Sequence, residues 1–418
     1  MHCGLDFGTS NSTLGMVEDG QPHLLALQDG RRAMPTAIFY AETGGPPLIG
    51  HDAVRAYLDG EEGRLLRSIK SILGTSLIEE STRIGRGRLP LKQAISDYIG
   101  HFKRLTEART GTELTSVVHG RPVHFVDDDP LGDQAAEDSL REILEGLGFR
   151  QIAFQVEPLA AARHFAHRFT REAVALVVDI GGGTSDFSTI HIRPGAEGSE
   201  GGKMEILGNH GIRLGGTNFD QVLSVNEVMP HFGRGVPLGE KGMEPPNWIF
   251  SDLSSWPRIQ TLYSHQALND VKALVRRSGN DPRFERLYTV VYEQLGHHLA
   301  GDVEGAKIAL SQEDSTTLQL DYLERDFSIP LTAQNLQSAL VDAQQRLEGA
   351  MDACLNVSGL VRGQIDLLVL TGGSTEMPIL QAQLRRLFPK AVLEPCDTFG
   401  AVGSGLALEA EALFGPNR

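Results

Sequence analysis

The chain has 418 residues, 40% of them hydrophobic, and its 38 basic and 54 acidic residues give a formal net charge of −16. That length exceeds what one hydrophobic core usually organises, so two lobes or domains are expected. The acidic balance argues against a general affinity for nucleic acid or anionic lipid, and no apolar run approaches the roughly 20 residues that cross a bilayer. The chain begins without a secretory signal, and its three cysteines, Cys3, Cys354 and Cys396, are far apart. We therefore expect reduced thiols in a cytoplasmic protein that binds neither nucleic acid nor membrane.

The first predicted element is a hairpin with a polar tip. The run around Asp6 is apolar, and residues 8–12 break the pattern before a second apolar run reaches Val17. Such a strand–turn–strand pattern is typical of two antiparallel strands. Residues 50–112 then have a charged, helical texture.

A strand candidate at 116–118 leads to Pro122 and the acidic stretch Asp127–Pro130. The spacing of that stretch fails the EF-hand pattern, so a solvated loop is expected rather than a calcium site. The next element is an amphipathic helix that ends at Gly148 and whose apolar positions recur at i, i+3, i+4 and i+7: Leu140, Ile143, Leu144 and Leu147.

A second strand–turn–strand pattern runs from Ala173 to Ile192, and a Gly/Glu-rich loop follows at 194–202. Residues 233–263 are rich in Pro and Gly and contain both tryptophans, which predicts a long insertion or surface loop. Helical patterns dominate residues 265–315 and 332–355. A last buried strand, Leu367–Leu370, leads through a Gly-Gly-Ser-Thr turn into a helix with Pro378 in its first turn.

The two hairpins repeat one design, in which a buried strand ends in Asp, one further residue, glycine and a hydroxyl residue. The copies are Asp6–Ser10 and Asp179–Thr184. Glycines let the backbone approach a polyphosphate closely, and successive N–H groups form an anion-binding concavity. Two carboxylates beside phosphates make chemical sense when Mg²⁺ lies between them. A single Gly-Gly-Gly turn is more often an ordinary hairpin, but two matched copies favour a nucleotide site.

Other nucleotide and metal motifs are absent. The sequence has no P-loop, no dinucleotide-binding glycine pattern after a strand, and no zinc-ligand spacing. The histidines on predicted helices, His164, His167, His297 and His298, are expected to be ordinary helix residues.

Eight segments in order resemble the nucleotide-binding domain of the heat-shock protein 70 chaperones, within the actin, sugar-kinase and chaperone superfamily. These segments cover nearly the whole chain: Gly4–Ser12, Ile69–Gly74, Gly120–Pro122, Glu157–Ala162, Asp179–Asp186, Leu214–Asp220, Glu304–Ser311 and Gly372–Thr375. The resemblance implies an α/β, two-lobed actin-like ATPase fold with duplicated ribonuclease-H-like lobes around a nucleotide cleft. It places lobe I at 1–170 and 392–418 and lobe II at 171–391, with smaller subdomains at about 40–112 and about 224–336.

The resemblance also implies a phosphoryl-transfer site, in which Asp6 and Asp179 would hold Mg²⁺ mostly through water. Asp186 would support a monovalent cation such as K⁺ or the hydration shell of Mg²⁺. Lys70 would contact the γ-phosphate and orient the attacking water, and Glu157 would position water and metal. The other matched positions would surround ATP or ADP: Gly8, Thr9, Ser10, Asn11, Gly181, Gly182, Gly183, Thr184, Gly215, Gly216, Glu304, Lys307, Ile308, Ser311, Gly372, Gly373, Ser374 and Glu376.

Two features depart from the family pattern. Two arginines sandwich adenine in the chaperones, whereas Ile308 and Glu376 occupy the matching positions here, so lower affinity or relaxed base selectivity is expected. The chain also ends without room for the chaperones' peptide-binding domain and lid, as in a shortened, YegD-like bacterial group. A protein client or co-chaperone would then bind the lobes or the 233–263 insertion, where Trp248, Phe250 and Trp256 form an exposed patch or pack onto the lobe beneath.

The leading interpretation is a slow Mg²⁺-dependent ATPase that acts as a chaperone-like conformational switch. A nucleotide sensor or scaffold without hydrolysis is the main alternative, because positions 308 and 376 lack arginine. A small-molecule kinase or an actin-like filament protein would share the two hairpins, but the hairpins alone supply no base for a substrate hydroxyl.

Overall fold

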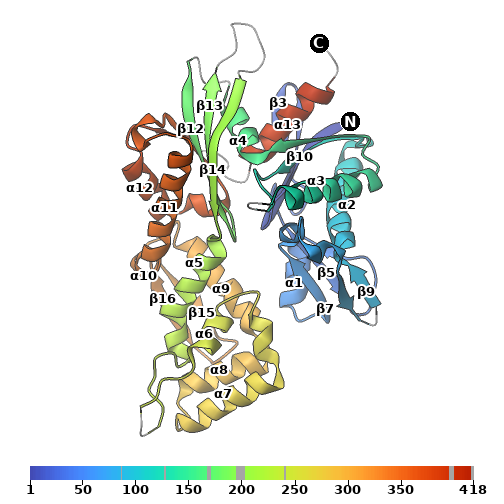
Figure 1. Ribbon diagram of the computed structural model, residues 1–418. Helices are drawn as coiled ribbons and strands as arrows, with labels where there is room; N and C mark the ends of the chain where they lie inside the picture. Colours follow the sequence, from blue (N-terminus) through green and yellow to red (C-terminus); the bar gives the residue numbers. More distant parts are fainter. Residues whose placement is uncertain are drawn as a thin grey trace.

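The computed structural model describes residues 1–85, 87–126, 129–166, 171–193, 203–239, 242–394 and 400–415. Its polypeptide forms two lobes, each built on a mixed β-sheet, with helices between and around the sheets (Figure 1). This is the predicted two-lobed actin-like fold. No helix in the described ranges is long and apolar enough to cross a membrane. The predicted loop at 194–202, the acidic pair Asp127 and Asp128, and the side chains of His164, His167 and Cys396 lie outside what the structure describes.

Lobe I is the half built on the sheet of order β11-β10-β1-β2-β3, with β4 paired to β2. The antiparallel β1–β2 pair is the first predicted hairpin, and β10 is the strand predicted at 116–118. The strands are β1 (His2–Phe7), β2 (Asn11–Glu18), β3 (Gln21–Leu24), β4 (Met34–Pro35), β10 (Ser116–Arg121) and β11 (Gln151–Val156). The helices of this lobe are α2 (Leu91–Thr110), α3 (Pro130–Gly146), α4 (Glu157–Ala166) and α13 (Ala401–Phe414).

A small α/β unit inserted between β4 and α2 carries the predicted catalytic lysine. Three of its strands lie in the segment 50–112, which we expected to be helical. The expectation was wrong because strands this short, between charged turns, show no periodicity that distinguishes them from helix. Its elements are β5 (Ala37–Ala41), β6 (Leu48–Ile49), α1 (His51–Leu58), β7 (Gly63–Arg67), the 3-10 helices η1 (Ile69–Ile72) and η2 (Ser76–Glu79), β8 (Ser81–Ile84) and β9 (Gly87–Pro90).

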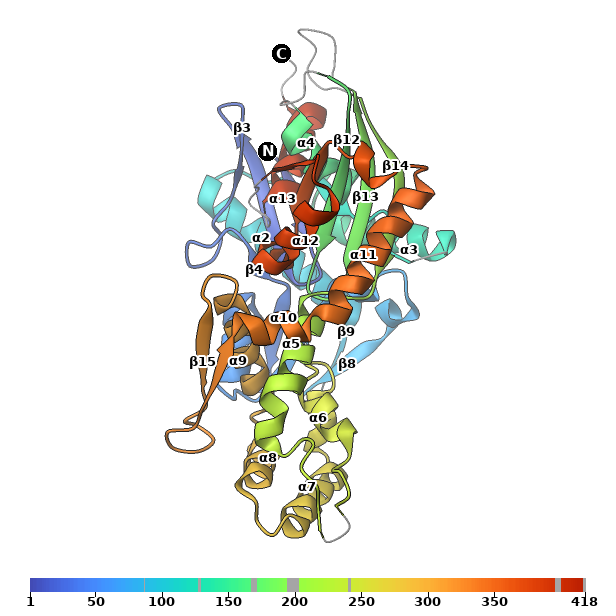
Figure 2. The same ribbon diagram turned by 90° about the vertical axis from the view of Figure 1, so that its left-hand side faces the viewer.

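Lobe II is the half built on the sheet of order β14-β13-β12-β17-β18. Its central β12 pairs in parallel with β17 and is buried along most of its length, which explains its unbroken apolar sequence. The strands are β12 (Ala173–Ile180), β13 (Ser185–Arg193), β14 (Lys203–Ile212), β17 (Leu367–Thr371) and β18 (Val392–Glu394). Figure 2 shows α11 (Val341–Val357) against this sheet and α12 (Pro378–Leu387), which begins at Pro378 as predicted, beside it.

The rest of lobe II is mainly helical and extends away from the sheet (Figure 1). It contains α5 (Gly216–Leu223), η3 (Ser224–Val228), η4 (Met229–Phe232), α6 (Asn247–Leu253), η5 (Ile259–Tyr263), α7 (His265–Arg277), α8 (Pro282–Tyr292), α9 (Gly296–Ala309), β15 (Ser315–Gln319), β16 (Ser328–Thr332) and α10 (Ala333–Ala339). Two further 3-10 helices, η6 (Arg362–Gln364) and η7 (Gly373–Glu376), flank β17.

The segment predicted as an insertion or surface loop divides in two: the described residues of 233–246 have little regular structure and many are exposed, whereas 247–263 is mainly helical. Residues 247–253 and 259–263 form α6 and η5. Their apolar side chains belong to the lobe II core, where Phe250 is fully buried. Trp256 contacts lobe I, which leaves Trp248, 43% exposed, as the only one of the three aromatic residues on the surface. The exposed three-residue patch therefore does not form: Phe250 packs into the core and Trp256 against lobe I, while Trp248 stays on the surface.

The two lobes are joined by a core that is rich in small residues. Helices α4 and α13 pack against each other between the sheets, and a Cβ on Gly405 would lie 1.8 Å from Ala160 O. On the other side of α13, a Cβ on Gly4 of β1 would lie 2.4 Å from the backbone at Leu406. Only glycine permits these approaches, so the sequence itself fixes how closely α13 packs against α4 and β1.

Candidate functional site between the lobes

The tips of the two hairpins meet where the lobes face each other. Asp6 lies near the end of β1 opposite Thr13, and Asp179 lies near the end of β12 opposite Asp186. A Cβ on Gly182 would lie 2.0 Å from Ser10 Oγ, so the two glycine-containing turns are in contact. The structure thus brings together two segments about 170 residues apart, as the repeated design predicts.

Lys70 is the cation at this meeting point. Its side chain is 8% exposed, and its Nζ donates to Glu157 Oε1 at 2.6 Å. Burial alone would lower the pKa of Lys70, but Glu157, Asp6 and Asp179 together raise it above its usual value. The ammonium therefore stays charged, and it is held by a carboxylate rather than by solvent.

The two aspartates are strongly perturbed. Burial, Glu157 and Asp179 raise the pKa of Asp6 to about 8, against the lowering effect of Lys70. Burial, Asp186 and Glu157 raise the pKa of Asp179 to about 7, although Thr371 donates to Asp179 Oδ1 at 3.3 Å. Several carboxylates facing one lysine leave an excess of negative charge that a divalent cation would neutralise.

These residues fit Mg²⁺ held mostly through water. No group of three His, Cys, Asp or Glu side chains in the described ranges converges as a ready-made metal cage. Mg²⁺ commonly uses one or two carboxylates plus phosphate oxygens and retained water, which is the donor set that Asp6 and Asp179 offer. A small cavity of about 40 Å³ beside them is lined by Asp179, Asp186 and Glu157, a size and chemistry suited to a water molecule or a monovalent cation.

Lobe II holds the glycine turn after β12 with backbone contacts rather than with charged side chains. Gly216 N donates to Gly181 O at 2.9 Å, and both the backbone N and the hydroxyl of Thr217 donate to Gly182 O at 2.7 Å. A Cβ on Gly215 would lie 2.6 Å from Gly181 O, so the start of α5 can approach the turn only as glycine. No side chain lies within 4 Å of a Cβ on Gly183, and Thr184 is exposed, which leaves this side of the turn open to a ligand.

A third strand, β17, ends at the site, and the residue after it has a left-handed backbone conformation that favours glycine. Gly372 has φ 79°, and a Cβ there would lie 2.7 Å from Asp179 Oδ1. The chain then continues into η7, where Ser374 Oγ lies 3.5 Å from Gly181 O and Gly373 is the first residue. Glycine at position 372 therefore brings η7 and the Asp179 turn together.

The side of the site where the resemblance predicts the nucleoside is formed by α9. Lys307, 7% exposed, places its Nζ 2.7 Å from Asp220 Oδ1 and donates to Gly216 O at 3.3 Å. Burial raises the pKa of Asp220 to about 6 despite Lys307. Glu304 lies one turn earlier on α9, and Ser311 follows the helix with its hydroxyl donating to Lys307 O. Asp220 lies within one of the segments that resemble the family, but the sequence alone did not predict its ion pair with Lys307.

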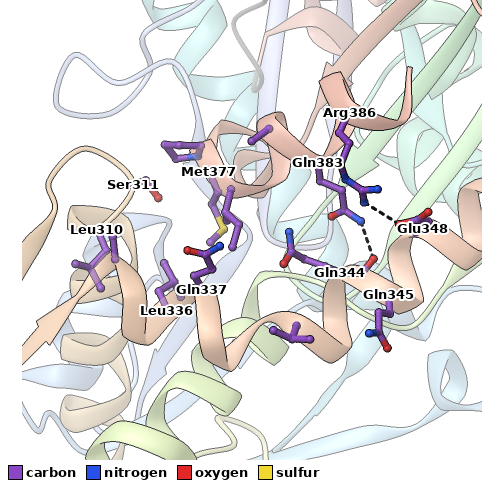
Figure 3. A pocket seen from close by; sticks show the side chains of 15 residues that line it. Leu310, Ser311, Leu336, Gln337, Gln344, Gln345, Glu348, Met377, Gln383 and Arg386 are labelled. Atoms are coloured by element: carbon purple, nitrogen blue, oxygen red, sulfur yellow. Dashed lines mark hydrogen bonds and ion pairs between the residues drawn. The ribbon is translucent and has the colours of Figure 1, made fainter. Parts of the chain in front are cut away.

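The base side is open and lacks a cation at the two expected positions. Ile308 is 55% exposed, and Glu376 is exposed at the end of η7. A cavity of about 600 Å³ opens beside Ser311 and Met377 and runs between α10, α11 and α12 (Figure 3). Its walls combine apolar side chains with glutamines, and Gln383 Nε2 donates to Gln344 O at 2.8 Å. None of the phosphate-side residues lines this cavity, so it adjoins the base side only.

Of the remaining site predictions, Gly8 and Thr9 lie in the first turn and Asn11 begins β2; a Cβ on Gly8 would lie 2.1 Å from Asn11 O. The sequence missed two further features of this region. Thr371 was not recognised as a partner of Asp179, and Arg67, three residues before Lys70, was not recognised as crossing to the other lobe. Both depend on contacts between residues far apart in sequence, for which no local pattern exists.

Comparison with known proteins places this site in context. A family model described as Hsp70 protein matches residues 2–92 and 292–418, which include Asp6, Lys70 and α9. A curated relative, the chaperone protein HscA homolog of Shewanella denitrificans, is 24% identical over 432 aligned positions. The alignment covers 99% of this chain but 58% of the relative, so the chain spans less than two thirds of that protein's length.

Proposed function

Because this chain belongs to the Hsp70 protein family, we propose that it binds ATP and ADP with Mg²⁺ between its lobes and hydrolyses ATP slowly. The observation that carries this proposal is the buried Lys70–Glu157 pair facing Asp6 and Asp179 where the two hairpins meet. We further propose that the domains divide at the predicted boundaries, supported by separate cores in the two lobes. Two buried free cysteines, Cys3 and Cys354, support a cytoplasmic location.

Each residue would contribute by position and charge. Bound Mg²⁺ would neutralise charge on the phosphates, and Asp6 and Asp179 would hold its water shell. Lys70 would donate to a terminal phosphate oxygen, and Glu157 would accept a proton from, and so orient, the attacking water. The backbone N–H groups of the two glycine turns would bind the remaining phosphate oxygens. This distribution agrees with phosphoryl transfer, in which positioning and charge neutralisation supply most of the catalysis.

A chaperone-like switch is the biological role that we propose, with nucleotide exchange changing the angle between the lobes. The relative's printed name, a chaperone protein, supports that role. A protein client or co-chaperone would then bind the lobes. ATP-dependent protection of the chain in limited proteolysis is the expected sign of the switch, and identical digestion with ATP, with ADP and without nucleotide would contradict it.

Calorimetry of ATP and ADP binding, with and without Mg²⁺, tests the site directly, followed by single-turnover hydrolysis. The informative variants are Asp179→Asn and Lys70→Ala. Lys92→Ala is the matched control, because Lys92 pairs with Glu142 on the surface of the same lobe. We expect Mg²⁺-dependent binding that Asp179→Asn weakens and hydrolysis that Lys70→Ala abolishes. Absence of binding at millimolar nucleotide would refute the proposal.

One alternative is favoured by a specific observation. Ile308 and Glu376 leave the base side without the arginine pair of the family, which would suit a sensor or scaffold that binds nucleotide without turnover. Wild-type binding without hydrolysis, unaffected by Lys70→Ala, would support this second function.

A further inference from the structure

Four side chains connect the lobes at the rim of the site, and we call them the clasp: Tyr57, Arg67, Trp256 and His297. The Tyr57 hydroxyl on α1 lies 2.9 Å from His297 Nδ1 on α9. His297 Nε2 lies 3.1 Å from Trp256 O, and the Arg67 guanidinium lies 4.5 Å from the centre of the Trp256 ring. The His297 ring also meets the rings of Tyr57 and Trp256 edge-on. The clasp thus joins the small unit of lobe I to the helical part of lobe II.

The hydrogen bonds of the clasp define one protonation state. Burial lowers the pKa of His297 to about 4, and burial raises the pKa of Tyr57, so at neutral pH the imidazole is uncharged and the phenol keeps its proton. A carbonyl can only accept, so His297 Nε2 carries the hydrogen and donates to Trp256 O. Nδ1 must then accept from the Tyr57 hydroxyl. Both polar contacts are satisfied without a net charge at His297.

Arg67 differs from an ordinary surface arginine. It is partly buried, burial lowers its pKa, and within the described ranges no carboxylate lies at ion-pair distance from it. Glu304 and Asp220, on the nucleoside side of lobe II, act on it from further away. The flat face of Trp256 provides a direct contact for its guanidinium, a cation–π interaction across the two lobes.

The backbone links Arg67 to Lys70 through a strained turn. Arg67 ends β7, Lys70 lies in η1, and Ser68 between them has φ 56°, a left-handed conformation that is disfavoured without glycine. The Ser68 carbonyl accepts from both the backbone N and the hydroxyl of Ser71, at 3.0 Å and 2.7 Å. These hydrogen bonds hold the bend, so we expect a displacement of Arg67 to be transmitted to Lys70.

We propose that the clasp positions Lys70, so that contact between the lobes at the rim sets the lysine beside Glu157 and Asp6. Arg67 and Tyr57 are then positioning residues that touch neither phosphate nor metal. The catalytic consequence rests on the proposed ATPase function, whereas the placement of Lys70 does not depend on it. Lobe opening at the rim would withdraw the lysine before nucleotide leaves, which would make hydrolysis contingent on closure.

The placement of Lys70 can be measured without nucleotide. Acylation of Lys70 by a small amine-reactive ester is followed by mass spectrometry, together with amide hydrogen exchange of residues 65–73. The variants are Arg67→Gln, which removes the stacked cation, and Tyr57→Phe, which removes one oxygen and keeps the ring. Arg83→Gln is the matched control, because Arg83 is an arginine of the same small unit that donates to Gly85 O at an exposed site.

We expect Arg67→Gln to raise both Lys70 acylation and local amide exchange about tenfold and Tyr57→Phe to raise them by a smaller factor, while Arg83→Gln leaves both unchanged. Circular dichroism and thermal melting verify folding, and Tyr57→Phe keeps the test decisive if Arg67→Gln does not fold. Wild-type acylation and exchange in the folded clasp variants would overturn the proposal.

Single-turnover hydrolysis separates this inference from the proposed function. A positioning role predicts that kcat falls about tenfold in Arg67→Gln while KM for ATP changes little. Wild-type turnover that is unaltered in the clasp variants would refute the positioning role and leave the ATPase intact. Increased Lys70 acylation in a protein that binds no nucleotide would refute the ATPase and uphold the positioning role.

Discussion

The phosphate side and the base side of the candidate site are built by different means. On the phosphate side, buried charges face one another, and a Cβ added to several of the glycines would lie closer than 3 Å to a neighbouring atom. On the base side, Ile308 is more than half exposed, and a large cavity lies next to Ser311. Charge and close packing constrain a site tightly, whereas an open apolar wall constrains it little. We therefore expect this chain to recognise polyphosphate and metal strictly and the base loosely.

The largest effect should come from the lysine of the phosphate side. Lys70→Ala leaves Glu157 without its partner and removes a donor to the terminal phosphate, and the loss in hydrolysis rate should be about 100-fold or more. Nucleotide affinity should change much less. Single-turnover rates and calorimetry on the same preparation would show this split. Equal losses in rate and affinity would mean that Lys70 serves binding rather than catalysis.

Removing a metal-side carboxylate should have the next largest effect. Asp179→Asn should weaken Mg²⁺-dependent ATP binding about 30-fold, because a charged hydrogen-bonding or coordinating group contributes roughly 1.5–3 kcal/mol. Without Mg²⁺ the variant should bind nucleotide as well as the wild type, since one repulsive charge is gone. A titration with EDTA and with Mg²⁺ distinguishes these outcomes, and an equal loss under both conditions would place Asp179 outside the metal's shell.

The ion pair on the nucleoside side should affect stability as well as binding. Lys307→Met leaves Asp220 buried without its cation, which should cost about 3 kcal/mol of unfolding free energy. Adding Asp220→Asn should restore part of that stability but not the nucleotide affinity, if Lys307 also contacts the ribose. Urea unfolding of both variants measures the first effect. A double variant as unstable as the single one would show that the pair itself is not the cause.

The clasp should give the site an acid limit that the phosphate side does not set. The pKa of His297 is about 4 in the folded protein and about 6.5 in an unfolded chain, so the unfolded chain takes up the proton first as pH falls. The contribution of uncharged His297 to the free energy of unfolding is complete above about pH 6.5 and is lost towards pH 4. In total it amounts to roughly 2–3 kcal/mol. Urea unfolding of wild type and His297→Gln across this range tests the sign, and parallel pH profiles would assign the acid limit elsewhere.

The smallest effect should be a gain on the base side. Ile308→Arg restores a cation beside the base, and a cation–π contact at an exposed site is worth about 0.5–1 kcal/mol, or a two- to fivefold tighter Kd for ATP. Ile308→Leu is the matched control, because it keeps an apolar face. We expect the gain to be larger for purine than for pyrimidine nucleotides. Unchanged affinity for every base would show that the base lies elsewhere, for example nearer the cavity.

Sequence patterns predicted local features well. Both hairpins, the helix over 130–146, the helices over 265–309 and 333–357 and the last buried strand follow from periodicity and from turn residues. The sequence patterns predicted the wrong structure in two places. The strands β7, β8 and β9 are too short to show a period of two, and the 233–263 segment contains Pro and Gly between residues that are buried. In both places the outcome depends on packing rather than on local propensity.

The sequence by itself determined the chemistry of the two turns, because glycine, hydroxyl and carboxylate residues at fixed spacing dictate backbone conformation and charge locally. Only the tertiary structure decided which residues these turns face. Lys70 meets Glu157, 87 positions later, and Tyr57 meets His297, 240 positions later. The first contact arises when the inserted small unit packs onto the rest of lobe I, and the second when the two lobes meet. No local pattern encodes them, so the clasp and the surroundings of Lys70 became visible only in three dimensions.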